Sequence, residues 1–130
     1  MSANINTVQA QYDALNTGNT AAFLTTLTED CVWIEAEGSM VAGTHVGPQG
    51  VLDGVLRPLG SAVDLEIRAV EFMDGEDGEV LVSGTYTLTH RGNGRRETTP
   101  FTAVKTVRDG RVCRASDAYD TDALNRVFDN

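Results

Sequence analysis

The stretch FTAVKTVRDGRVCRASDAYD, residues 101–120, contains two strand-like runs on either side of Asp109-Gly110. An Asp-Gly pair between two such runs is a strong signal for a two-residue β-hairpin. The same alternation of apolar and polar residues starts soon after Gly60, and the joins DGEDGE and RGNGRR are rich in turn residues. The predicted strands span residues 62–73, 79–90, 98–107 and 111–119. The second half of the chain therefore predicts an antiparallel sheet.

The first half is predominantly helical by its spacing of apolar residues. A stripe from Ile5 to Leu15 ends at Asn16-Thr17-Gly18, and a second helix with an apolar face follows up to Leu27. A strand is expected at 31–37, a glycine-rich loop after it, and a third helix from Pro48 to Leu59. A short helix closes the chain. This order predicts one α+β domain over residues 1–130, in which an antiparallel sheet curved over the N-terminal helices leaves a hollow that is a natural pocket.

Composition excludes several classes of function. The net charge of −9 argues against a nucleic-acid partner, and no apolar run is long enough to span a membrane. The start MSANINTVQ has no signal-peptide pattern, so we expect a soluble, non-exported, cytoplasmic protein. Neither the two cysteines nor the two histidines have the spacing of a metal motif. No phosphate-binding glycine loop or nucleotide fingerprint is present, so no metal and no cofactor is expected.

Glu35 stands out in the stretch CVWIEAEGS, residues 31–39, because it directly follows strand residues that suit a sheet core. Burying an unpaired carboxylate costs several kcal/mol or more. Strand parity places Glu35 on the same face as Trp33. One interpretation is a pocket carboxyl whose pKa is raised by desolvation beside the indole, ready for proton transfer. The other is a solvated carboxylate near the end of the strand.

Four stretches together resemble the SnoaL-like group of the nuclear-transport-factor-2-like superfamily, which includes the ketosteroid isomerases. They are YDALNTGNTAAFLTTLTEDCVW, VAGTHVGPQGV, VLVSGTYTLTHRGNGR and FTAVKTVRDGRVCRASDAYDT, and the resemblance covers nearly the whole chain. It implies a cone formed by a bent sheet and closing helices, with one pocket. It also implies pairing into a homodimer through the outer face of the sheet.

The resemblance to ketosteroid isomerases implies that Glu35 occupies the position of their general-base aspartate. Their oxyanion-hole tyrosine falls at Gln11, one place before Tyr12, and their protonated aspartate falls at Thr102. Both oxyanion partners therefore differ from the isomerase pattern.

The resemblance to the epoxide hydrolases of this superfamily implies a role for Asp117, in the stretch SDAYD. The Arg-x-Asp pair of those enzymes falls at Gly84 and Tyr86, so their triad is incomplete here. Asp117 is either a second pocket carboxyl or a polar residue that leads into the next turn.

The predicted site thus has Glu35 and Asp117 as catalytic groups, and Trp33, Tyr12, Tyr86 and Thr102 as substrate-binding groups. Tyr12 is either a hydroxyl donor at the pocket or a core tyrosine. We expect a cofactor-free enzyme that moves a proton beside the carbonyl group of a small apolar compound, as isomerisation, dehydration (a lyase reaction) or cyclisation requires. The alternative is a non-catalytic, dimeric domain that binds a small ligand.

Overall fold

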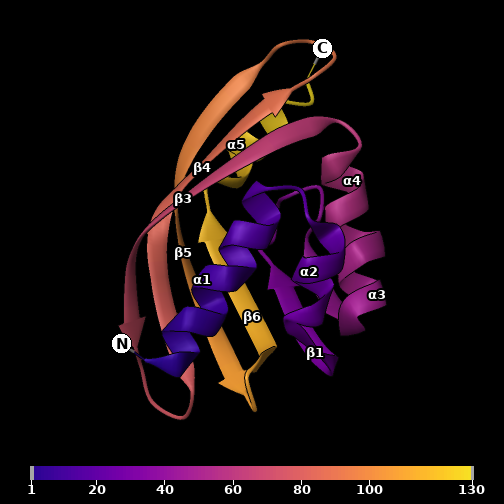
Figure 1. Cartoon of the computed structure of the whole chain (residues 1–130). Coiled ribbons are helices and arrows are strands. Elements are labelled where there is room, and N and C mark those ends of the chain that lie inside the picture. Colours follow the sequence, from indigo (N-terminus) through magenta and orange to yellow (C-terminus); the bar gives the residue numbers. More distant parts are fainter. Residues whose placement is uncertain (1, 130) are drawn as a thin grey trace.

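A six-stranded curved sheet forms the body of the protein in the computed structural model, which describes residues 2–129 (Figure 1). The strand order is β2-β1-β6-β5-β4-β3. The strands are β1 (Leu27–Glu35), β2 (Gly43–Val46), β3 (Val63–Asp74), β4 (Glu79–His90), β5 (Arg96–Arg108) and β6 (Arg111–Tyr119). All neighbours are antiparallel except β1 and β6, which run parallel. The α+β cone is confirmed, but its sheet is mixed, whereas the sequence predicted an antiparallel one.

Helices cover the concave side of this sheet. They are α1 (Ala3–Asn16), α2 (Thr20–Thr25), α3 (Gly47–Val51), the π-helix η1 (Leu52–Leu56), α4 (Arg57–Gly60) and α5 (Thr121–Arg126). Figure 1 shows α1 lying along the inner side of the long bent strands, and it contacts β3, β4, β5 and β6. Within the described residues no helix is long and apolar enough to cross a membrane.

The end of α1 is tied to β3 by one amide side chain. Asn16 Nδ2 donates to the Ile67 carbonyl at 2.8 Å, and the Ile67 N–H donates to Asn16 Oδ1 at 2.7 Å. Because the amide satisfies both backbone groups of Ile67, it aligns the last turn of α1 with the sheet. Tyr12 lies one turn earlier on the same helix, so this link also positions its side chain.

The hairpin between β5 and β6 forms at Asp109-Gly110 as predicted. Both residues have positive φ, +52° and +79°, as a type I′ turn requires. The register shifts once between Thr106 and Val107, and beyond this shift Lys105 pairs with Ala115 and Ala103 pairs with Asp117. Side chains from the two strands therefore meet on the same face.

Three predicted elements differ from the structure. The first strand begins at Leu27, which the sequence placed in the second helix, and β2 lies where a glycine-rich loop was expected. The third helix contains a π-helical turn. Pro58 has no N–H to donate to the Gly54 carbonyl, so the regular α-helical bond cannot form there. Just before it, the Arg57 N–H donates to the Leu52 carbonyl, five residues back, as in a π-helix.

Candidate functional site

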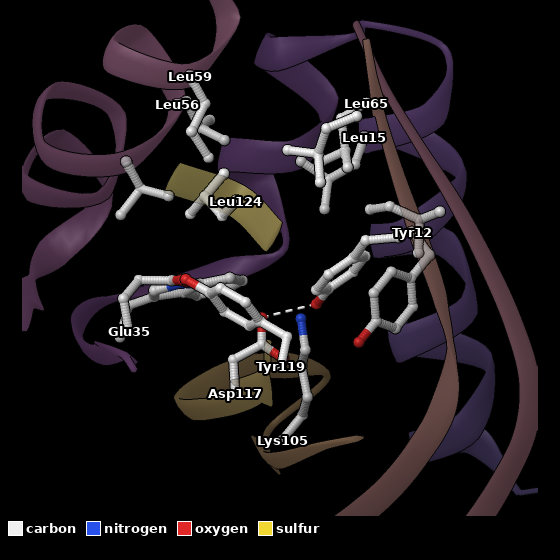
Figure 2. Close-up of a pocket in the computed structure, with 15 residues that line it drawn as sticks. Tyr12, Leu15, Glu35, Leu56, Leu59, Leu65, Lys105, Asp117, Tyr119 and Leu124 are labelled. Carbon is white, nitrogen blue, oxygen red and sulfur yellow. Dashed lines mark hydrogen bonds between the residues drawn. The ribbon is translucent and has the colours of Figure 1, made fainter. Parts of the chain in front are cut away.

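A cavity of about 70 Å³ lies between the concave face of the sheet and the helices (Figure 2). One side is apolar and the opposite side carries the ionisable groups, as Figure 2 shows. The apolar lining consists of Leu15, Val55, Leu56, Leu59, Leu65, Ile67, Leu88 and Leu124. The polar lining consists of Tyr12, Trp33, Glu35, Tyr86, Lys105, Asp117 and Tyr119. Two carboxyl groups and one amine thus face a mostly apolar space.

Glu35, the last residue of β1, lies in the cavity wall and is only 6% exposed. The Trp33 indole N–H donates to Glu35 Oε2 at 2.6 Å, and the Tyr119 hydroxyl donates to Oε1 at 3.0 Å. Burial raises the pKa of Glu35 above its usual value, although these donors and Lys105 act in the opposite direction. Of the two sequence interpretations, the structure shows the pocket carboxyl and not the solvated one.

Asp117, on β6, has two carboxylate oxygens in different surroundings. The Tyr86 hydroxyl donates to Oδ2 at 2.6 Å, whereas Oδ1 is buried and has no hydrogen-bond partner within residues 2–129. Burial and then the nearby Glu35 raise the pKa of Asp117 to about 7. The structure therefore places Asp117 in the cavity wall with one oxygen that no described residue satisfies.

Lys105 is a site residue that the sequence analysis missed. It is 2% exposed, and its Nζ donates to Gln11 Oε1 at 2.6 Å. The ammonium also lies 4.3 Å from the ring centre of Trp33 and 4.5 Å from that of Tyr12. Burial lowers the pKa of Lys105 to about 8, against the pull of both carboxyl groups. Strand parity was the available signal, because position 105 lies on the same face of the strand as the apolar positions 101, 103 and 107.

Gln11 and Tyr12 have distinct roles on α1. Gln11 is fully buried, accepts from Lys105, and donates from Nε2 to Thr26 Oγ1 at 2.7 Å, so it orients the lysine. The Tyr12 hydroxyl is buried, and nothing among the described residues bonds to it. Burial raises the pKa of this phenol, so it remains a donor at neutral pH. Tyr12 lines the cavity, so its unsatisfied hydroxyl belongs to the polar side of the site.

Tyr86 and Thr102 illustrate how strand parity decides which side chains reach the cavity. Tyr86 stacks on Phe101 with ring centres 4.0 Å apart, and its hydroxyl reaches Asp117. Thr102 is exposed, whereas its neighbours Phe101 and Ala103 are buried. Thr102 therefore faces away from the cavity, and its prediction as a substrate-binding residue is wrong.

The incomplete epoxide-hydrolase pattern has a structural reason at Gly84. A Cβ at this position would meet the Arg68 carbonyl oxygen at 2.0 Å, where β3 passes close to β4 beside a register shift. No arginine fits there without moving the strands. Residues 2–129 also contain no cluster of three or more His, Cys, Asp or Glu side chains that could hold a metal ion.

Comparisons with known proteins agree with this architecture. A family model described as the SnoaL-like domain matches residues 8–115. An NTF2-like protein from Burkholderia thailandensis E264 is 23% identical, with a TM-score of 0.88 and 100% of both chains covered. An NTF2-like protein of unknown function from Burkholderia pseudomallei K96243 is 26% identical, with a TM-score of 0.90 and the same coverage. TerC, co-crystallized with polyporic acid, is 26% identical over 97% of this chain and 98% of its own, with a TM-score of 0.86. No curated protein matches the chain.

Proposed function

The chain belongs to the SnoaL-like domain family, and from the chemistry of its cavity we propose that it is an enzyme that transfers a proton without a cofactor. The substrate is a small, mostly apolar compound with a carbonyl group, and the reaction is an isomerisation, dehydration or cyclisation. Asp117 carries the proposal, because one of its oxygens is buried in the cavity without a partner and its pKa is about 7. A general base works best when its pKa lies near the operating pH.

Each polar group has a defined part in this proposal. The Tyr12 hydroxyl donates to the carbonyl oxygen of the substrate, and Asp117 Oδ1 removes a proton from the adjacent carbon. Tyr86 holds the other oxygen of Asp117 in place. Glu35 accepts from Trp33 and Tyr119 and acts as the acid. It donates its own proton elsewhere on the substrate, and the proton on Asp117 then passes to Glu35 to restore the starting state. Isomerisation, dehydration and cyclisation all share the first of these steps.

The apolar half of the cavity supports a small ligand and a route of access. At about 30 Å³ for each molecule in liquid water, the cavity of about 70 Å³ has room for about two water molecules. Leu15, Leu56, Leu59 and Leu65 also line a neighbouring groove of about 560 Å³. These four leucines separate the two spaces, so their movement joins the cavity to the groove when a ligand enters. That TerC was co-crystallized with polyporic acid supports a small-molecule ligand in this fold.

Hydrogen exchange in D₂O tests the proposal without knowledge of the natural substrate. Cyclohexanone serves as the probe, and deuterium incorporation beside its carbonyl group is followed by NMR. The wild-type rate is expected to rise with pH through about 7 as Asp117 ionises. Asp117→Asn keeps the Tyr86 contact but cannot act as a base, so we expect a loss of about a hundredfold or more.

The matched control is Asp30→Asn, which removes an exposed carboxylate that pairs with Arg108 far from the cavity. It is expected to retain the wild-type exchange rate. A folded Asp117→Asn protein with the full rate would contradict the proposal. If wild-type protein binds cyclohexanone but catalyses no exchange, the alternative of a non-catalytic binding domain is favoured instead.

A further inference from the structure

Lys105 is the only lysine among the ten Lys and Arg residues of the chain. All nine arginines are exposed, whereas Lys105 is buried in the cavity wall. Arginine keeps its charge in proteins, whereas a buried lysine readily becomes a neutral amine. The chain therefore uses guanidinium groups for all of its surface positive charge and places its one side-chain amine inside the candidate site.

The contacts of Lys105 do not fix it as a buried counter-ion. Within residues 2–129 its ammonium forms no ion pair with a carboxylate, and its hydrogen bond goes to the neutral amide of Gln11. Its other close neighbours are the ring faces of Trp33 and Tyr12. Figure 2 shows its nitrogen pointing from the sheet into the cavity, near Asp117. A buried charge held only for structure is normally paired directly.

We propose that Lys105 Nζ is a nucleophile that condenses with a small aldehyde or unhindered ketone in this cavity to form an imine. The neutral amine attacks the carbonyl carbon, which forms a C–N bond and breaks the C=O π bond, and the attacking nitrogen passes one of its protons to the carbonyl oxygen to give a neutral carbinolamine. The C–O bond then breaks, and the oxygen leaves as water after receiving a proton from Asp117. The products are a protonated imine on Lys105, one water molecule and the Asp117 carboxylate.

Two buried groups are placed to assist these steps. Tyr12 and Asp117 line the cavity, and the buried Tyr12 hydroxyl and Asp117 Oδ1 have no hydrogen-bond partner in the described part of the chain. The phenol can bind the carbinolamine oxygen, and the carboxyl can supply the proton that releases water. Because the pKa of Lys105 is about 8, about a tenth of the amine is neutral at pH 7. Glu35 and Asp117 are the charged groups that oppose this lowering.

The proposal rests on the ligand class of the proposed function, a small carbonyl compound, and assigns a covalent step to it. A protonated imine withdraws electrons more strongly than the parent carbonyl group, so the adjacent C–H becomes more acidic. Asp117, a carboxylate once the water has left, is then the base for that hydrogen. The amine therefore raises the reactivity of ligands that the carboxyl groups alone would deprotonate slowly.

Reductive trapping tests this inference directly. The protein is incubated at pH 7 with butanal and sodium cyanoborohydride, which reduces an imine to a stable secondary amine. Peptide mass mapping then locates the added butyl group. We expect it on Lys105, and the N-terminal amine of the same molecule is the internal reference because it is the only other amine in the chain.

The relocation variant Lys105→Met/Arg96→Lys moves the only lysine to the surface and changes the formal net charge from −9 to −10. At pH 7 we expect labelling of wild-type Lys105 to be at least about tenfold faster than labelling at position 96 in this variant, because an ordinary lysine is almost wholly protonated there. Equal labelling rates at Lys105 in wild type and at position 96 in the variant would overturn the imine proposal. Labelling of only the N-terminal amine in wild type would overturn it as well. If wild-type protein is not labelled at Lys105 but still catalyses cyclohexanone exchange, the imine is contradicted and the acid–base function stands. If Lys105 is labelled but no exchange occurs, the acid–base function is contradicted and the imine stands.

Discussion

At the residue scale, the two cavity carboxyl groups differ in how their oxygens are satisfied. Both oxygens of Glu35 accept hydrogen bonds, whereas Asp117 has one bonded and one unbonded oxygen. A carboxylate whose lone pairs are engaged is a weaker base, and one with a free oxygen can approach a ligand. This difference is why Asp117, and not the more conspicuous Glu35, is proposed as the primary base.

Asp117→Asn is expected to change how stability depends on pH. The folded pKa of Asp117 is raised from 3.8 to about 7, so the folded protein keeps a proton that the unfolded chain loses in this window. Stability from this group is therefore complete below about pH 4 and falls as pH rises to about 7. The variant should be more stable than wild type by roughly 4 kcal/mol at pH 8 and near wild type at pH 4.

Urea unfolding of both proteins at the two pH values measures this difference. Lys105 contributes in a separate window, because its lowered pKa makes wild-type stability rise with pH between about 8 and 10.5. A stability difference between variant and wild type that is the same at pH 4 and pH 8 would show that Asp117 has an ordinary pKa.

Residue-level prediction from the sequence depended on strand parity. Parity correctly placed Glu35 beside Trp33, and the same rule applied to β5 would have identified Lys105 and rejected Thr102. Thr102 was chosen from a family position instead, and that position falls between the buried positions 101 and 103, one residue away from the inward-facing side. The Tyr119 partner of Glu35 and the Tyr86 partner of Asp117 come from β6 and β4, so they follow from tertiary packing, which no local pattern encodes.

At the element scale, the π-helical turn η1 packs closely against a histidine at its glycine, Gly54. A Cβ on Gly54 would lie 2.2 Å from His45 Nδ1, and His45 Nε2 lies 2.9 Å from the Val41 carbonyl oxygen. The histidine therefore packs against the bare backbone of η1, and it does not line the cavity. Val55 and Leu56 of the same turn do line it.

Gly54→Ala and Gly60→Ala form a matched pair that tests this packing. The added methyl at position 54 must displace the His45 ring, so we expect a loss of about 1 to 3 kcal/mol in the free energy of unfolding. At Gly60, in α4, nothing lies within 4 Å of the added methyl, and the change should be neutral or stabilising by up to about 1 kcal/mol. Equal effects of the two substitutions in urea unfolding would argue against a tight contact with His45.

Elements with strong local signals were predicted closely, and those set by tertiary contacts were not. The strands β4 and β6 span the predicted residues, and the Asp109-Gly110 turn joins β5 to β6. The short strand β2 was missed because GTHV sits among glycines and owes its conformation to pairing with β1. The parallel pairing of β1 with β6 joins distant parts of the chain, so hairpin patterns could not reveal it.

At the scale of the whole molecule, exposed apolar residues on β3 and β4 support the expectation of a homodimer. Met73 and Leu81 pair across these strands, and they are 61% and 41% exposed. Light scattering at micromolar concentration is expected to give the mass of a dimer. Met73→Lys should lower that mass because it places a charge on an apolar surface, whereas Glu29→Lys on β1 should not. A wild-type monomer would contradict the pairing.

The proposed proton transfer depends on carboxyl groups held in a dry cavity beside a single buried amine. The most direct measurement is an NMR titration of the side-chain carboxyl carbons in uniformly ¹³C-labelled protein, with Asp117→Asn to assign one signal. We expect Asp117 to titrate near pH 7 and Glu35 to titrate above its usual pKa of 4.5. If Asp117 and Glu35 both titrate near pH 4, as exposed carboxyls do, the cavity is wet and the proposed proton transfer is contradicted.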